Sequence, residues 1–105
     1  MRVLCLLLLC ALSAGAQDTK LSWDASTTPA VTYNVYHKPS ACNSTAAFVK
    51  ISTAPVTVLT FTHVNAPMGV SCYAVRSEAG GAESVNSNLL QVVLQPAPPT
   101  NLRTP

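Results

Sequence analysis

The feature that most constrains the fold is residues 70–88, in which two strand-like stretches flank a pair of glycines. Residues 70–77 alternate between two faces, which is the period of a β-strand. Gly80 and Gly81 supply the positive φ angles that a tight reversal of the chain requires. We therefore predict a strand, a glycine turn and a return strand that continues through residues 89–94.

Residues 1–16 are typical of a signal peptide. Arg2 precedes an apolar run over residues 3–12, and an Ala-Gly-Ala motif that ends at Ala16 matches the small-residue cleavage pattern. The alternative, an uncleaved membrane anchor, would need about 20 apolar residues, which is more than this run offers. We predict cleavage after Ala16 and a mature chain that is secreted or periplasmic and has no further contact with the membrane.

The predicted mature chain is close to neutral. The whole sequence has six basic and four acidic residues, so removal of Arg2 leaves five against four, a net charge of +1. This is too little to predict binding to nucleic acid or to an anionic membrane. Eight prolines and few charged residues favour short strands joined by loops over helices.

Two cysteines remain after removal of the leader, because Cys5 and Cys10 lie within it. An exported chain with an even number of cysteines usually forms disulfides, so we expect Cys42 to pair with Cys72. The bond would close a loop of about thirty residues and contribute roughly 3–4 kcal/mol in the chain-entropy model. Two free thiols are an alternative, whereas a metal site would need more thiol or imidazole ligands nearby.

Other short stretches show strand-like alternation or are rich in β-branched residues. They cover residues 21–23, 31–38, 48–51 and 58–64. Polar or proline-containing turns separate them, including a turn at residues 65–69, and helical periodicity is not found. We predict an all-β fold for residues 17–95, a β-sandwich of six or seven antiparallel strands. Leu59 should face inward, and the expected core is Trp23, Tyr33, Val35, Phe61, Tyr73, Val75, Leu90 and Val92.

The ordered set of these segments resembles a fibronectin type III domain of the kind common in bacterial secreted proteins. The similarity covers residues 21–94 and rests on motifs that look like strands B, C, C′, E and F and the start of G: Leu21-Ser22-Trp23, Val31-Thr32-Tyr33-Asn34-Val35-Tyr36, Phe48-Val49-Lys50-Ile51, Thr60-Phe61-Thr62-His63-Val64, Cys72-Tyr73-Ala74-Val75-Arg76-Ser77, and Glu83-Ser84 with Ser87-Asn88. The resemblance implies an immunoglobulin-like β-sandwich. It also implies that the end of strand C lies beside the start of strand F, so that Cys42 could reach Cys72 across the solvent face of that sheet.

The chain departs from the family pattern in two places. The tyrosine that usually lies two residues before Tyr73 is replaced by Ser71, so the tyrosine corner is expected to be missing or weaker. Only four residues precede Leu21 after the predicted cleavage, whereas residues 96–105 resemble the family's proline-rich first strand. This proline-rich tail can be a frayed terminus or the stub of a longer array. Alternatively, it pairs with the exposed strand edge of a neighbouring molecule.

We predict no enzyme activity and no catalytic, cofactor or metal site. His37 and His63 fall on strands of different sheets and are interpreted as surface residues. The four acidic residues are scattered, and no serine lies in a nucleophile motif. The sequon that begins at Asn43 would be used only in a eukaryotic host, and the bacterial character of the resemblance predicts that it is unmodified.

Tyr36 is expected to face outward on its strand and, with Arg76, to form a possible binding face. Together with the resemblance, this favours a secreted, non-catalytic binding or adhesion module that acts through a sheet face or loops. Its partner would be a protein or a polysaccharide at a cell surface or in the extracellular space. The alternative is a structural spacer or assembly unit that is joined end to end, by self-association, through residues 96–105.

Overall fold

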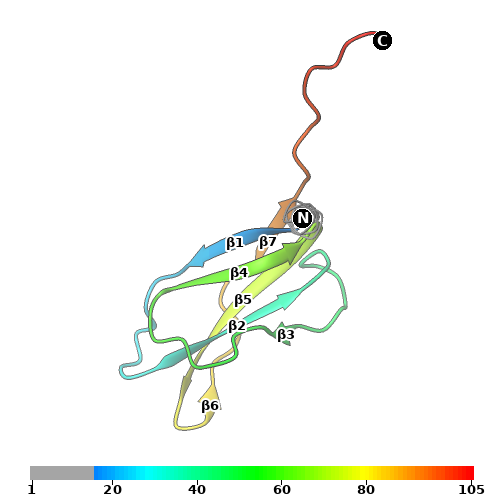
Figure 1. Ribbon diagram of the computed structural model, residues 1–105. Helices are drawn as coiled ribbons and strands as arrows, with labels where there is room; N and C mark the ends of the chain where they lie inside the picture. The colour runs from blue at the N-terminus through cyan, green and yellow to red at the C-terminus, as the bar shows by residue number, and fades with distance from the viewer. Residues whose placement is uncertain (1–15) are drawn as a thin grey trace, which may run out of the picture.

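The computed structural model describes residues 16–105, which form seven β-strands and no helix (Figure 1). The strands are β1 (Ala16–Ser22), β2 (Thr32–Lys38), β3 (Val49–Lys50), β4 (Thr60–Pro67), β5 (Gly69–Ala79), β6 (Ala82–Glu83) and β7 (Leu90–Leu94). The all-β prediction is therefore confirmed. The predicted signal peptide, residues 1–16, lies outside the described residues apart from Ala16. In the described range, no helix has the length and apolar character needed to cross a bilayer.

The strands form two antiparallel sheets that face each other, which is consistent with the predicted β-sandwich (Figure 1). Within residues 16–105, one sheet contains β1 and β4 alone. The other has the order β3-β2-β5-β6, and β7 pairs with the part of β5 that β6 leaves free. Gly80 and Gly81 make the turn between β5 and β6, and their φ angles of 59° and 84° confirm the role predicted for them.

The core lies between the two sheets and is centred on Leu21 from β1, Val35 from β2 and Tyr73 from β5. Other apolar side chains pack against these three: Trp23, Ile51, Val56, Phe61, Val75 and Val92. Most of the predicted core is therefore present, but Leu90 is 47% exposed and Leu59 is 38% exposed. Their predicted burial is wrong, because Leu59 precedes β4 and Leu90 lies on the outer strand β7, opposite a sheet of only two strands.

Strand β4 continues through most of the segment that was predicted as a turn, residues 65–69. Asn65 has a φ angle of 56°, and the register of β1 against β4 shifts opposite it, which identifies a bulge. A side-chain oxygen of Asp18 accepts a hydrogen bond from the backbone N–H of Asn65 at 3.0 Å and stabilises this bulge. Pro67 fits at the end of β4 because, among the described strands, β4 pairs with β1 alone and its other edge is unpaired.

The predicted disulfide between Cys42 and Cys72 is present, with 5.0 Å between the two Cα atoms. It joins the loop between β2 and β3 to β5. Lys38 Nζ holds the same loop by donating to the carbonyl oxygens of Cys42 at 3.1 Å and Ser44 at 2.9 Å. The backbone N–H of Cys42 donates to Gln91 Oε1 on β7 at 3.0 Å. The loop is therefore fixed across the outward face of the five-stranded sheet.

Residues 96–105 form no strand and extend away from the two sheets (Figure 1). The carbonyl oxygen of Gln95, the last residue before this tail, accepts a hydrogen bond from Gln17 Nε2 at 3.1 Å. Every residue of the tail is exposed. This extended course agrees with four prolines in ten residues, since each proline fixes φ and removes a hydrogen-bond donor.

Candidate functional site

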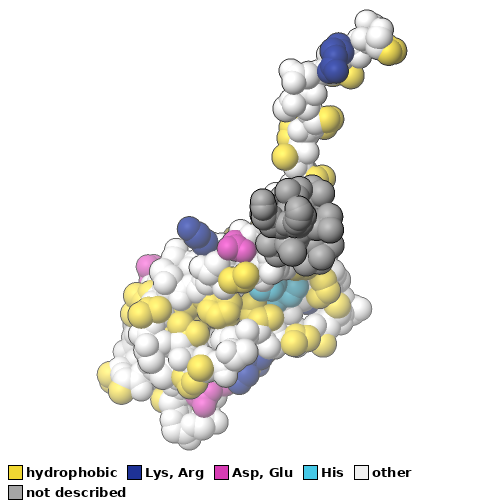
Figure 2. Space-filling view, viewed as in Figure 1, with side chains coloured by type: hydrophobic (Ala, Val, Ile, Leu, Met, Phe, Trp, Pro, Cys, Tyr) yellow, Lys and Arg dark blue, Asp and Glu magenta, His cyan; other side chains and the backbone are white. Residues whose placement is uncertain are grey.

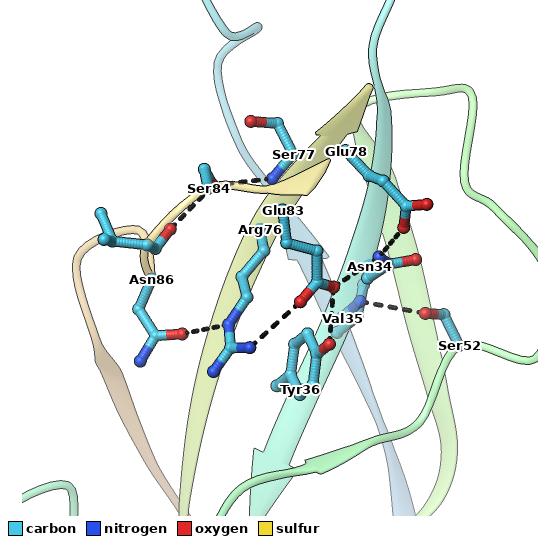
Figure 3. A network of polar contacts seen from close by, with 11 residues as sticks. Asn34, Val35, Tyr36, Ser52, Arg76, Ser77, Glu78, Glu83, Ser84 and Asn86 are labelled. Atoms are coloured by element: carbon cyan, nitrogen blue, oxygen red, sulfur yellow. Dashed lines mark hydrogen bonds and ion pairs between the residues drawn. The ribbon is translucent and has the colours of Figure 1, made fainter. Parts of the chain in front are cut away.

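Polar side chains gather on the outward face of the five-stranded sheet (Figure 3). We call this group the outer network, and it contains Asn34, Tyr36, Arg76, Glu78, Glu83 and Asn86. Strand alternation places the members from β2 and β5 there, because their neighbours in sequence point into the core. The two-residue turn between β5 and β6 then sets Glu83 directly opposite Glu78.

At the centre of the outer network, Arg76 stacks on Tyr36. The guanidinium carbon lies 4.2 Å from the centroid of the tyrosine ring, which is a cation–π contact. Arg76 Nη1 forms an ion pair with Glu83 Oε1 at 3.1 Å, and its Nε donates to Asn86 Oδ1 at 2.7 Å. Among the described residues, Nη2 of Arg76 makes no hydrogen bond. The guanidinium is thus held in place, while its Nη2 N–H groups remain available as hydrogen-bond donors.

Glu78 and Glu83 lie directly opposite each other on neighbouring strands, where like charges repel. The side chain of Asn34 offsets this repulsion, because its Nδ2 donates to Glu78 Oε1 and to Glu83 Oε2, each at 2.7 Å. The Tyr36 hydroxyl also donates to Glu83 Oε2, at 2.6 Å. This bond from Tyr36, followed by the one from Asn34, lowers the pKa of Glu83, and the bond to Glu83 raises the pKa of Tyr36.

The two residues predicted as a binding face, Tyr36 and Arg76, are therefore in direct contact. Figure 2 shows acidic and basic side chains adjoining at the end of the molecule where β6 lies. Glu83 was not among the predicted site residues, although a two-residue glycine turn fixes which residues of a hairpin face each other. No local pattern predicts the position of Asn34, because it depends on the register between β2 and β5.

A second polar group lies between the two sheets. We call it the histidine cluster, and it contains His37, His63, Ser71 and Tyr73. The ring centroids of His37 and His63 are 4.8 Å apart, and they lie 4.9 Å and 5.6 Å from that of Tyr73. His37 Nε2 shares a hydrogen bond with Ser71 Oγ at 2.9 Å, and His63 Nδ1 shares one with the Tyr73 hydroxyl at 2.6 Å.

The interpretation as surface residues is wrong for His37, which is buried, whereas His63 is half-buried. They do come from different sheets, but these sheets face each other, so the two rings meet across the interior. His37 is only 8% exposed. The same alternation that turns Val35 and Phe61 inward also turns His37 and His63 inward, so the sequence did contain the signal.

The histidine cluster should make the fold sensitive to acid. Burial lowers the pKa of both His37 and His63, and the charge of His63 adds to the effect on His37. The folded state therefore favours neutral rings, whereas the unfolded chain protonates near the ordinary histidine pKa of about 6.5. The stabilisation is fully present above about pH 6.5 and should be lost as the pH falls below this value. Urea unfolding between about pH 7.5 and about pH 5 measures the loss.

The matched control for this prediction is His63→Gln, because a glutamine amide can still bond the Tyr73 hydroxyl but does not titrate. The unfolding free energy of the variant should depend less steeply on pH over this range than that of the wild type. Identical slopes in the two proteins would show that His63 does not titrate as its burial implies.

Within residues 16–105, no three His, Cys, Asp or Glu side chains converge as metal ligands. No family model matches the chain, and no curated protein shows significant similarity to it.

Proposed function

We propose that the chain is an exported, non-catalytic binding module of the fibronectin type III kind, which contacts a protein partner through the outer network. The pairing of the strands supports this fold. Taken in order, β1 to β5 correspond to strands B, C, C′, E and F of the resemblance, and β6 and β7 share the place of strand G. They pair as B with E and as C′-C-F-G, which are the two sheets expected of such a sandwich.

Export is supported by two features. A disulfide such as Cys42–Cys72 is typical of compartments outside the cytoplasm. The predicted signal peptide would direct the chain across a membrane and leave it secreted or periplasmic.

The observation that carries the proposed function is the stacked pair of Arg76 and Tyr36. Arginine and tyrosine are enriched at the energetically dominant positions of protein interfaces. Here Glu83 and Asn86 already order the guanidinium, so little side-chain entropy would be lost on binding. The free Nη2 donors can bond a carboxylate or a backbone carbonyl oxygen of the partner.

A protein partner is favoured over a polysaccharide. The guanidinium of Arg76 covers one face of the Tyr36 ring and so leaves at most the other face for a sugar ring to stack on. The groups that remain available are charged hydrogen-bonding groups of both signs, which suit complementary contacts with another protein.

Replacement of Arg76 by alanine should weaken binding to the partner about tenfold or more, as expected for a residue at the centre of an interface. The experiment probes an array of extracellular proteins and polysaccharides with the wild type, Arg76→Ala and Lys20→Ala. Lys20 is the matched control, because it is an exposed cation on the other sheet. Thermal unfolding establishes that both variants are folded.

The proposal would be supported if the wild type binds a protein, Arg76→Ala binds it more weakly, and Lys20→Ala binds it as the wild type does. Two results would contradict it: binding by Arg76→Ala that equals that of the wild type, or binding to polysaccharides alone.

A further inference from the structure

Among the described strands, the two-stranded sheet has an unpaired edge along β1. β1 pairs with β4 along one edge, and within residues 16–105 no strand pairs with its other edge. Where β1 ends, residues 22–24 lie across a cleft of about 640 Å³ from residues 84–88, which are hydrogen-bonded to β5. Trp23 and Tyr33 line this cleft. The free strand edge and the cleft are continuous, because β1 runs directly into residues 22–24.

Several polar groups around the cleft already form hydrogen bonds within the chain. The hydroxyls of Ser84 and Ser87 each accept a hydrogen bond from the backbone of β5 and donate one to a carbonyl oxygen of their own segment. The Tyr33 hydroxyl accepts one from the backbone N–H of Ser26 at 2.9 Å. The indole N–H of Trp23 is buried and has no partner among the described residues. Aromatic surface next to a free strand edge suits an extended peptide better than a small polar ligand.

Residues 96–105 have the properties of such a peptide. They form no regular structure of their own, and Leu102, their only large aliphatic side chain, is 98% exposed. Asn101 has a φ angle of 58°, so this residue would change conformation on joining a strand. In a strand, Pro96 and Pro98 fall in one row of backbone groups and Pro99 in the other, so pairing has to run through residues 100–104, which contain no proline. Arg103 is the one charged residue of the tail, and Asp24 lines the cleft with the opposite charge.

The tail is poorly placed to enter the cleft of its own chain. Gln95 is bonded to Gln17 near the start of β1, whereas the cleft begins at Ser22, the end of that strand. From Gln95 the tail runs away from β1 (Figure 1). To return, it would have to reverse within residues 96–99, three of which are prolines with a fixed φ. The cleft of a second copy is not subject to this constraint.

We propose that residues 100–104 of one copy add as a strand to the free edge of β1 in a second copy, with Leu102 inserted into the cleft beside Trp23. Main-chain hydrogen bonds along β1 would supply affinity, and the Leu102 side chain would fix the register. The added strand would also cover an edge that is otherwise a template for unspecific pairing. The tail and the edge of β1 are different surfaces of the molecule. If each copy inserts its tail into the next copy, an open chain of copies forms; if two copies insert their tails into each other, a closed dimer forms.

The test is sedimentation equilibrium of the full chain over a roughly hundredfold range of concentration. The average mass should rise with concentration for the wild type and stay at the monomer value for Leu102→Asp, a change at an exposed position that leaves the fold intact. Val49→Asp is the matched control, because Val49 is 62% exposed on β3 and does not line the cleft. It should associate like the wild type. A wild type that stays monomeric, or loss of association in both variants, would overturn the proposal.

Trp23 gives a second, local measurement, because it is the only tryptophan in the chain. Its fluorescence emission should shift to shorter wavelength as the concentration of the wild type rises. A synthetic peptide of residues 95–105 should produce the same shift when it is added to Leu102→Asp, and the peptide with Leu102 replaced by aspartate should not.

Two fluorescence results would also overturn the proposal. Association without a change at Trp23 would place the contact elsewhere, and a shift at constant monomer mass would place the tail in its own cleft. Arg76→Ala should associate like the wild type, so this test succeeds or fails independently of binding through the outer network.

Discussion

Replacing Cys42 and Cys72 together by alanine should lower the free energy of unfolding by about 3–4 kcal/mol. The disulfide joins residues that are 30 positions apart, so its loss gives the unfolded chain much more conformational freedom. A domain of this size buries limited apolar surface, and a loss of this magnitude would remove much of its total stability. Urea unfolding followed by circular dichroism measures the change.

Reduction provides the control for this prediction. Adding dithiothreitol to the wild type should reproduce the loss, and adding it to the double-alanine variant should change nothing. If the oxidised wild type and the variant differ by less than about 1 kcal/mol, the disulfide does not constrain the fold as described.

Replacing Tyr73 by alanine should cost about 3–5 kcal/mol, the range for removal of a buried aromatic side chain. Tyr73 packs with Leu21 and Val35 at the centre of the core, and its ring also contacts both histidines of the cluster. The substitution therefore leaves a cavity between the two sheets. It also removes the hydroxyl that is bonded to His63.

Tyr73→Phe separates these two effects. The phenylalanine ring fills the same space but leaves His63 Nδ1 without its partner, so a loss of about 1–3 kcal/mol is expected. Urea unfolding of the wild type and both variants gives the three free energies. Equal losses in Tyr73→Phe and Tyr73→Ala would contradict the packing role, and a loss below about 1 kcal/mol in Tyr73→Ala would contradict burial of the ring.

Alternation with a period of two predicts much of this fold, because each sheet buries one face. It located β2 and β5 to within a few residues, together with the glycine turn that follows β5. It could not show that β4 continues to Pro67, because a proline is tolerated only on a free strand edge, and edges are set by the whole sheet. The exposure of Leu90 likewise depends on the narrow sheet opposite it.

The sequence predicts the direction in which the side chains of the candidate site point, but it does not predict which of them touch. The outward direction of Tyr36 and Arg76 follows from the alternation of β2 and β5. Their contact depends on the register between these strands, in which Asn34 pairs with Arg76, and no local pattern fixes a register over this distance. For His37 and His63 the alternation of their strands does predict an inward direction, because they lie two residues after Val35 and Phe61.

The outer network lies on the outward face of its sheet, and the cleft lies between the two layers, because the two sheets face each other across the histidine cluster. A nuclear Overhauser spectrum of the chain tests this directly. His37 and His63 lie on different sheets with 4.8 Å between their ring centroids, so cross-peaks between their ring protons are expected. If these cross-peaks are absent from a spectrum that does show the contacts between paired strands within each sheet, the two-layer arrangement is contradicted.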